Sequence, residues 1–106
     1  MSKVVYSRNW NGYYIPDEVL EEYCKRAGVS LTEDTRFSIE QSIPRHDSLL
    51  IELVENYISS HDCGLSIKDI GEAEKYYLEE YDGIEYVYTE ETIPWMYVNK
   101  SSSNTQ

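Results

Sequence analysis

The sequence predicts a small α+β domain in which two helices pack on one face of a mainly antiparallel sheet. Two segments carry apolar residues at helical spacing, and an Asp-Gly dipeptide separates two β-prone runs near the C-terminus. The length of 106 residues corresponds to one domain. We place this domain at residues 1–98 and expect the apolar-free tail at 99–106 to be disordered.

The first half of the chain is expected to begin with a strand at residues 3–7 and a turn at Asn11-Gly12. A helix should follow at 16–27, because Pro16 suits the first helical position and Gly28 suits the residue just past the end. The residues that share one face of this helix are Val19, Leu20, Tyr23, Cys24 and Ala27.

The middle of the chain contains the most clearly marked element, a second helix preceded by Pro44 and capped by Asp47 or Ser48. Before it, Phe37 and Ile39 alternate with polar residues, which predicts a short strand near 36–40. The one-sided apolar pattern of the second helix comprises Leu49, Leu50, Leu53, Val54, Tyr57 and Ile58.

The last part of the chain is expected to be β-structure. A strand is predicted at 65–70, and a hairpin is predicted from strands 75–81 and 84–91, joined by Asp82-Gly83. Residues 93–98 are expected to add an edge strand. Counting outward from the turn places six residues on one hairpin face: Tyr77, Glu79, Tyr81, Ile84, Tyr86 and Tyr88.

Several classes of protein are excluded or disfavoured by composition. Cys24 and Cys63 are expected to be reduced thiols, and His61-Asp62-Cys63 lacks the second cluster of ligands that a zinc site needs. The chain has no apolar run of the ~18 residues that cross a membrane, and its start lacks an export signal. We therefore expect no metal, no cofactor and no membrane association.

Charge is the most informative property of the sequence. Twenty acidic and nine basic residues give a net charge of −11, which argues against direct binding of nucleic acid. Between residues 69 and 91, Lys75 is the only base. The acids of this segment, which we predict to bind a basic partner, are Asp69, Glu72, Glu74, Glu79, Glu80, Asp82, Glu85, Glu90 and Glu91.

The register of the predicted hairpin pairs like charges. Glu80 should face Glu85 and Glu74 should face Glu91, whereas Lys75 should face Glu90. Each like-charge pair costs about 0.2–1 kcal/mol. Charge reversal at Glu80 and Glu85 together is therefore expected to weaken partner binding and to leave the fold as stable or more so. The hypothesis is that these carboxylates contact a basic partner at some cost to stability; the alternative is an acidic surface that only keeps the protein soluble.

Three stretches of the chain carry a family resemblance. They are RHDSLLIELVE from Arg45, LSIKDI from Leu65 and YYLEEYDGIEYV from Tyr76. The chain resembles a family of small, poorly characterised proteins of tailed bacteriophages and large DNA viruses. The resemblance implies a phage origin and action in a host cytoplasm, but no activity. The chain departs from the family in its acidity and in residues 8–12, where the family has a Gly-rich turn.

The favoured functional hypothesis is a phage inhibitor that mimics DNA. Its carboxylates would stand in for phosphates and occupy the basic surface of a host DNA-binding protein, with a nucleoid-associated protein of the HU type favoured. A restriction enzyme, RNA polymerase or CRISPR nuclease fits the same charge argument. The chain would act as a monomer or as a homodimer.

Two other classes of function are less favoured by the sequence. A nucleotide-binding counter-defence protein, or sponge, would use Arg45, Asp47 and the turn at 81–83, although a salt bridge from Arg45 to Asp47 or Asp82 is the simpler interpretation. An enzyme would need a base, yet His46 and His61 lie in no catalytic motif. We expect no catalytic residue.

Overall fold

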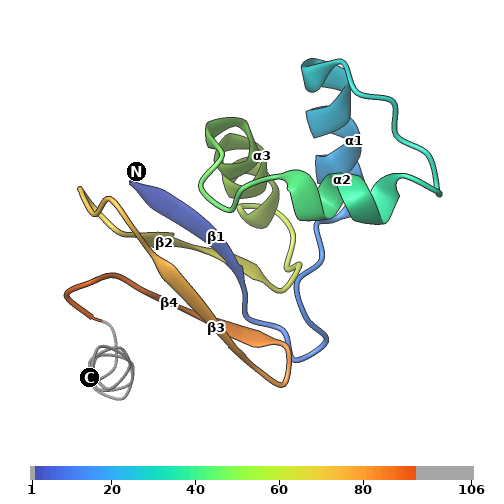
Figure 1. The fold of residues 1–106 in the computed structure, drawn as a ribbon. Coiled ribbons are helices and arrows are strands. Elements are labelled where there is room, and N and C mark those ends of the chain that lie inside the picture. Colours follow the sequence, from blue (N-terminus) through green and yellow to red (C-terminus); the bar gives the residue numbers. More distant parts are fainter. Residues whose placement is uncertain (1, 93–106) are drawn as a thin grey trace, which may run out of the picture.

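The computed structural model describes residues 2–92 (Figure 1). The predicted edge strand at 93–98 and the tail at 99–106 lie outside this range. The α+β class is confirmed, with two antiparallel pairs, β1–β2 and β3–β4. The elements in order are β1 (Lys3–Ser7), α1 (Asp17–Ala27), α2 (Arg36–Ser42), α3 (Ser48–Ile58), β2 (Leu65–Asp69), β3 (Tyr77–Tyr81) and β4 (Ile84–Tyr88).

The β1–β2 pair lies between the helices and the hairpin (Figure 1). Neighbouring side chains of β1 point to opposite faces, so Val5 joins the larger core with the helices, whereas Val4 packs with Ile70 and Val87. Both valines are fully buried. Each face of β1 is therefore covered, one by helices and the other by β4 and the segment that follows β2.

The first predicted helix is confirmed as α1. The helix begins at Asp17, one residue later than expected, and Pro16 directly precedes it. Gly28 ends the helix with a φ of +71°, and the Gly28 N–H donates a hydrogen bond to the Cys24 carbonyl oxygen. The predicted apolar face is buried at Val19, Leu20 and Cys24, whereas Ala27 in the last turn is exposed. No helix within residues 2–92 is both long and apolar enough to cross a membrane.

The second predicted helix is confirmed as α3. Asp47 is its cap, because its carboxylate accepts a hydrogen bond of 3.0 Å from the Leu50 N–H. Leu50, Leu53 and Val54 face the core, as the spacing predicts. The strand predicted on residues 65–70 is confirmed as β2.

The strand predicted near 36–40 is wrong, because these residues belong to α2. Phe37 and Ile39 imitate the alternation of a strand, but Phe37 is 63% exposed and the buried side chain of α2 is the polar Glu40. Arg36 lies one helical turn before Glu40 and forms an ion pair with it at 3.2 Å. The helix is thus held by the polar contacts of Glu40 together with Ile39, which is partly buried against the core.

The predicted hairpin is confirmed in its turn and register. Asp82 and Gly83 have φ values of +53° and +85°, and Glu80 faces Glu85. The strands end at Tyr77 and Tyr88, however, so the predicted cross-strand pairs Glu74–Glu91 and Lys75–Glu90 lie beyond the ladder and are wrong. The paired strands reach only to Tyr77 and Tyr88, so the four side chains of these predicted pairs do not face each other across the ladder.

Gly83 is the tightest glycine of the fold. A Cβ at this position would lie 2.1 Å from the Trp10 carbonyl oxygen, whereas one at Gly71 would meet nothing within 4 Å. Both have positive φ, so an alanine at either should cost about 1–2 kcal/mol through its backbone. We expect Gly83→Ala to lower the free energy of unfolding, measured in urea, clearly more than Gly71→Ala; equal effects would contradict the close packing of the turn on residues 10–12.

Candidate partner-binding surface

The nine carboxylates predicted to bind a partner fall into three classes of exposure. Glu85 is buried and Glu79 is half-buried. The exposed ones are Asp69, Glu72, Glu74, Glu80, Asp82, Glu90 and Glu91. The structure therefore leaves seven of the nine accessible to a partner.

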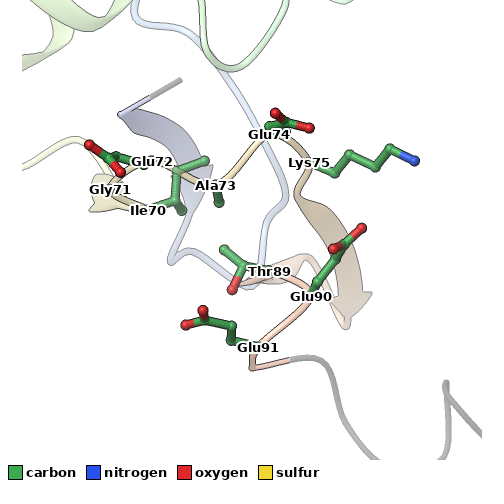
Figure 2. A pocket seen from close by; sticks show the side chains of 9 residues that line it. All are labelled: Ile70, Gly71, Glu72, Ala73, Glu74, Lys75, Thr89, Glu90 and Glu91. Carbon is green, nitrogen blue, oxygen red and sulfur yellow. The ribbon is translucent and has the colours of Figure 1, made fainter.

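Four of the exposed carboxylates gather where the strands end. Glu72 and Glu74 lie on the link between β2 and β3, and Glu90 and Glu91 lie on the turn after β4. Both segments border one hollow of about 410 Å³, and the four side chains surround it (Figure 2). We call these four residues the end cluster. Among the described residues that line this hollow, Lys75 is the one base.

Short-range hydrogen bonds shape both segments of the end cluster. In the first, Asp69 accepts a hydrogen bond of 2.8 Å from the Gly71 N–H, and the Ala73 N–H donates to the Ile70 carbonyl. In the second, the Thr92 hydroxyl oxygen accepts from the Thr89 N–H at 2.8 Å. These two turns bring together acids that are separated by the whole hairpin in the sequence.

The predicted carboxylates differ in whether a cation neutralises them. Within residues 2–92 the ion pairs of other acids lie on β1 and the helices, and Glu85 is the one predicted residue that forms an ion pair. Glu79, the end cluster and the remaining exposed acids form none. The described acids of the hairpin and its flanks, apart from Glu85, thus form no ion pair, although Asp69 lies opposite Lys3 in the β1–β2 ladder.

Glu85 corrects the sequence prediction, because it is a buried structural residue. It faces Glu80 in register as expected, but the face that they share is turned toward β1. Its two oxygens accept hydrogen bonds of 2.6 and 2.9 Å from Arg45, and the Ser7 N–H donates to it at 2.8 Å. Glu85 cannot contact a partner, and the predicted salt bridge from Arg45 to Asp47 or Asp82 is wrong.

A second buried carboxylate, Glu40, repeats this arrangement. It accepts a hydrogen bond of 2.7 Å from the Ile15 N–H and pairs with Arg36, whose guanidinium also donates to the Ile15 carbonyl at 2.6 Å. Each arginine lies over the ring of a tyrosine in the loop before α1. The guanidinium carbon is 3.4 Å from the ring centre for Arg45 over Tyr13 and 4.3 Å for Arg36 over Tyr14. The two networks therefore fix the loop that leads into α1.

The sequence did contain a signal for the role of Glu85. Alternation in the hairpin places Glu85 on the same face as Leu78 and Val87, which are apolar. A carboxylate on an apolar face needs a cation when that face is buried. Arg45 was available, but only the three-dimensional structure brings it to β4.

The opposite face of the hairpin is aromatic and partly exposed. Tyr81 is 52% exposed and Tyr86 is 43% exposed, and their rings meet edge to face with centroids 5.8 Å apart. The Tyr81 hydroxyl donates a hydrogen bond of 2.6 Å to Glu79 on the same face. We call Glu79, Tyr81 and Tyr86 the outer triad. The sequence placed them on one face, and the structure turns that face away from β1.

Residues 2–92 contain no group of three or more His, Cys, Asp or Glu side chains that could hold a metal ion. Cys24 is buried on α1 as predicted, and Cys63 is half-buried; both thiols are free.

Comparison of the chain with family models, with curated proteins and with solved structures finds no match. The resemblance to phage and viral proteins therefore stays a prediction.

The buried pair can be tested against its exposed neighbour in the ladder. Glu85→Gln leaves Arg45 without a counter-charge, so we expect the free energy of unfolding to fall by about 3–5 kcal/mol. Glu80→Gln changes an exposed side chain and should shift it by no more than about 0.5 kcal/mol. Urea unfolding of both variants measures the difference, and similar values would contradict the assignment of Glu85 as a structural residue.

Tyr13 makes the stability of the fold depend on pH in the alkaline range. Its buried hydroxyl has no hydrogen-bond partner within residues 2–92, and burial is the first cause that raises its pKa from 10.0 to about 12. Because the folded pKa is the higher one, its contribution to stability is complete below pH 10 and is lost as the pH rises toward 12. The loss amounts to about 2–3 kcal/mol.

Tyr13→Phe should remove this contribution. At neutral pH we expect the variant to be as stable as the wild type or up to about 1 kcal/mol more stable, because an unpaired buried hydroxyl is gone. Between pH 10 and 12 its unfolding free energy should fall less steeply than that of the wild type. Chemical unfolding at several pH values compares the two proteins, and identical slopes would show that Tyr13 does not titrate as its burial requires.

Proposed function

We propose that this protein is an acidic DNA mimic, encoded by a phage, that occupies the DNA-binding surface of a basic host protein and inhibits it. A nucleoid-associated protein of the HU type is the favoured partner, since such proteins grip DNA through charge and shape rather than base sequence. The proposal includes the host cytoplasm as the place of action, following the resemblance of the sequence.

The observation that carries the proposal is the end cluster. Four carboxylates from two separate turns surround one hollow, and none of them forms an ion pair within residues 2–92. Residues 76–92 contain no Lys or Arg, so the hairpin adds no positive charge beside them. Clustered, uncompensated anions attract a basic surface over a distance of about one Debye length.

The nucleotide sponge is less well supported than the sequence alone allowed. Its proposed cation, Arg45, is occupied by Glu85 and lies over Tyr13. The hollow beside the end cluster is bordered by carboxylates, which would repel the phosphates of a nucleotide. Both observations favour a cationic partner over an anionic ligand.

Competition with DNA tests the proposal directly. A labelled duplex is bound to a purified HU-type protein, and the full-length chain is added while fluorescence anisotropy reports the bound fraction of DNA. We expect displacement at low salt and a steep loss of displacement as salt rises, because the contact is electrostatic. An HU-type protein that keeps its DNA at low salt would exclude this partner, and a lysate pull-down that recovers no basic DNA-binding protein would contradict the proposal.

Matched charge reversals separate a binding surface from general acidity. Glu72→Lys with Glu91→Lys alters the end cluster, whereas Glu33→Lys with Asp34→Lys alters exposed acids before α2 by the same total charge. We expect the first pair to weaken competition about tenfold or more and the second pair to have a much smaller effect. Equal weakening would mean that only net charge matters and that the cluster is no binding site.

A further inference from the structure

In the site of Arg36, the tyrosine under the guanidinium is also hydrogen-bonded to the carboxylate that pairs with it. The Tyr14 hydroxyl donates a hydrogen bond of 2.9 Å to Asp17, and Arg36 donates to the same carboxylate at 2.8 and 3.1 Å. The guanidinium carbon of Arg36 lies 4.3 Å from the centre of the Tyr14 ring. One guanidinium thus contacts an aromatic face and a carboxylate that are already joined to each other.

The outer triad repeats the tyrosine and the carboxylate of this site on the molecular surface. The Tyr81 hydroxyl donates to Glu79 at 2.6 Å, as Tyr14 donates to Asp17. Tyr86 packs its ring against Tyr81 at an interplanar angle of 66° and so supports it from the neighbouring strand. Glu79 forms no ion pair within the part of the chain that the structure describes.

We propose that Glu79, Tyr81 and Tyr86 form a receptor for an arginine side chain of the basic partner. This inference rests on the proposed function and names the chemistry of its contact. The guanidinium would pair with Glu79 and lie against the exposed tyrosine rings, as Arg36 does with Asp17 and Tyr14. The end cluster then attracts the partner, and the outer triad selects for arginine.

Arginine fits this site better than lysine for a geometric reason. A guanidinium is planar, so it can stack on a ring while its N–H groups reach a carboxylate at the side. An ammonium group is compact and strongly hydrated, and it carries no flat surface. An anionic ligand is disfavoured at the carboxylate end of the triad by Glu79 itself, although Arg8 and Lys68 border a hollow beside Tyr86.

Two synthetic basic peptides test the inference on the full-length chain. They have the same sequence except that every Arg in one is Lys in the other, so their charge is equal. We expect the arginine peptide to bind at least about threefold more tightly, which is the size of an exposed cation–π contact. Calorimetric titration at low salt gives both affinities.

Variants of the triad show where this selectivity arises. Glu79→Gln keeps an acceptor for the Tyr81 hydroxyl but removes the charge, and Tyr81→Leu removes the ring. Each variant should bring the ratio of the two peptide affinities closer to one. Glu90→Gln is the matched control, because it removes the same charge from an exposed acid in the end cluster. It should weaken both peptides equally and leave the preference unchanged.

The outcomes distinguish this inference from the proposed function. Equal binding of the two peptides to the wild type, or a preference that survives both triad variants, overturns the arginine receptor and leaves the acidic mimic standing. Failure of both peptides and of the HU-type protein to bind overturns both. Should Tyr81→Leu fail to fold, Glu79→Gln decides alone, since its substitution is isosteric.

Discussion

The ion pair between Arg45 and Glu85 joins three parts of the fold at one buried carboxylate. Glu85 belongs to β4, Arg45 precedes α3, and the Ser7 N–H that donates to Glu85 belongs to β1. The backbone of Arg45 also binds β1, because its carbonyl accepts from the Val5 N–H at 2.8 Å. Burial of two charges is costly, and the pair is stable here because three N–H groups satisfy the carboxylate.

The same pair fixes which face of the hairpin is accessible. Glu85 must point toward β1 to reach Arg45, and strand alternation then turns Tyr81 and Tyr86 outward. Glu85 counts toward the net charge of the sequence, but its carboxylate is thereby removed from the surface. The acidity of the C-terminal third is still large, but its position is set by the turns at either end of the hairpin rather than by its strands.

The ion pair also joins two of the stretches on which the predicted family resemblance rests. Arg45 opens the first of the matching stretches, and Glu85 lies within the third, after the Asp82-Gly83 turn. The two stretches are separated in the sequence yet meet at this pair. A motif made of an arginine and an acid need not mark a ligand site, because in this chain the two residues bind each other.

The sequence predicted best the elements whose signals are local. Helices α1 and α3 have caps and one-sided apolar faces, and the Asp82-Gly83 turn sets the register of the hairpin, so these could be derived from neighbouring residues. Helix α2 could not be derived in this way, because its buried residue is the polar Glu40. One partner of Glu40 is the side chain of Arg36 in the same helix, but the other is the backbone N–H of Ile15, which is distant in the sequence.

The candidate surface was predicted in composition but not in shape. Glu72 and Glu91 were both expected to contact a partner, but their approach to one hollow depends on how the chain leaves β2 and β4. The burial of Glu85 depends on a tertiary contact that no local pattern encodes. Charge can therefore be counted from a sequence, whereas its accessibility requires the packing of the strands.

Charge alone would make a poor selector among basic proteins. Exposed carboxylates attract any cationic surface, and salt screens that attraction equally for every partner. Discrimination needs groups whose geometry fits one kind of side chain, held on rigid elements before the partner arrives. The outer triad satisfies this condition, because a hydrogen bond and a ring contact order it on paired strands whose other face is anchored by Arg45. In this fold the buried ion pair thus holds in place the surface that we propose for selective binding.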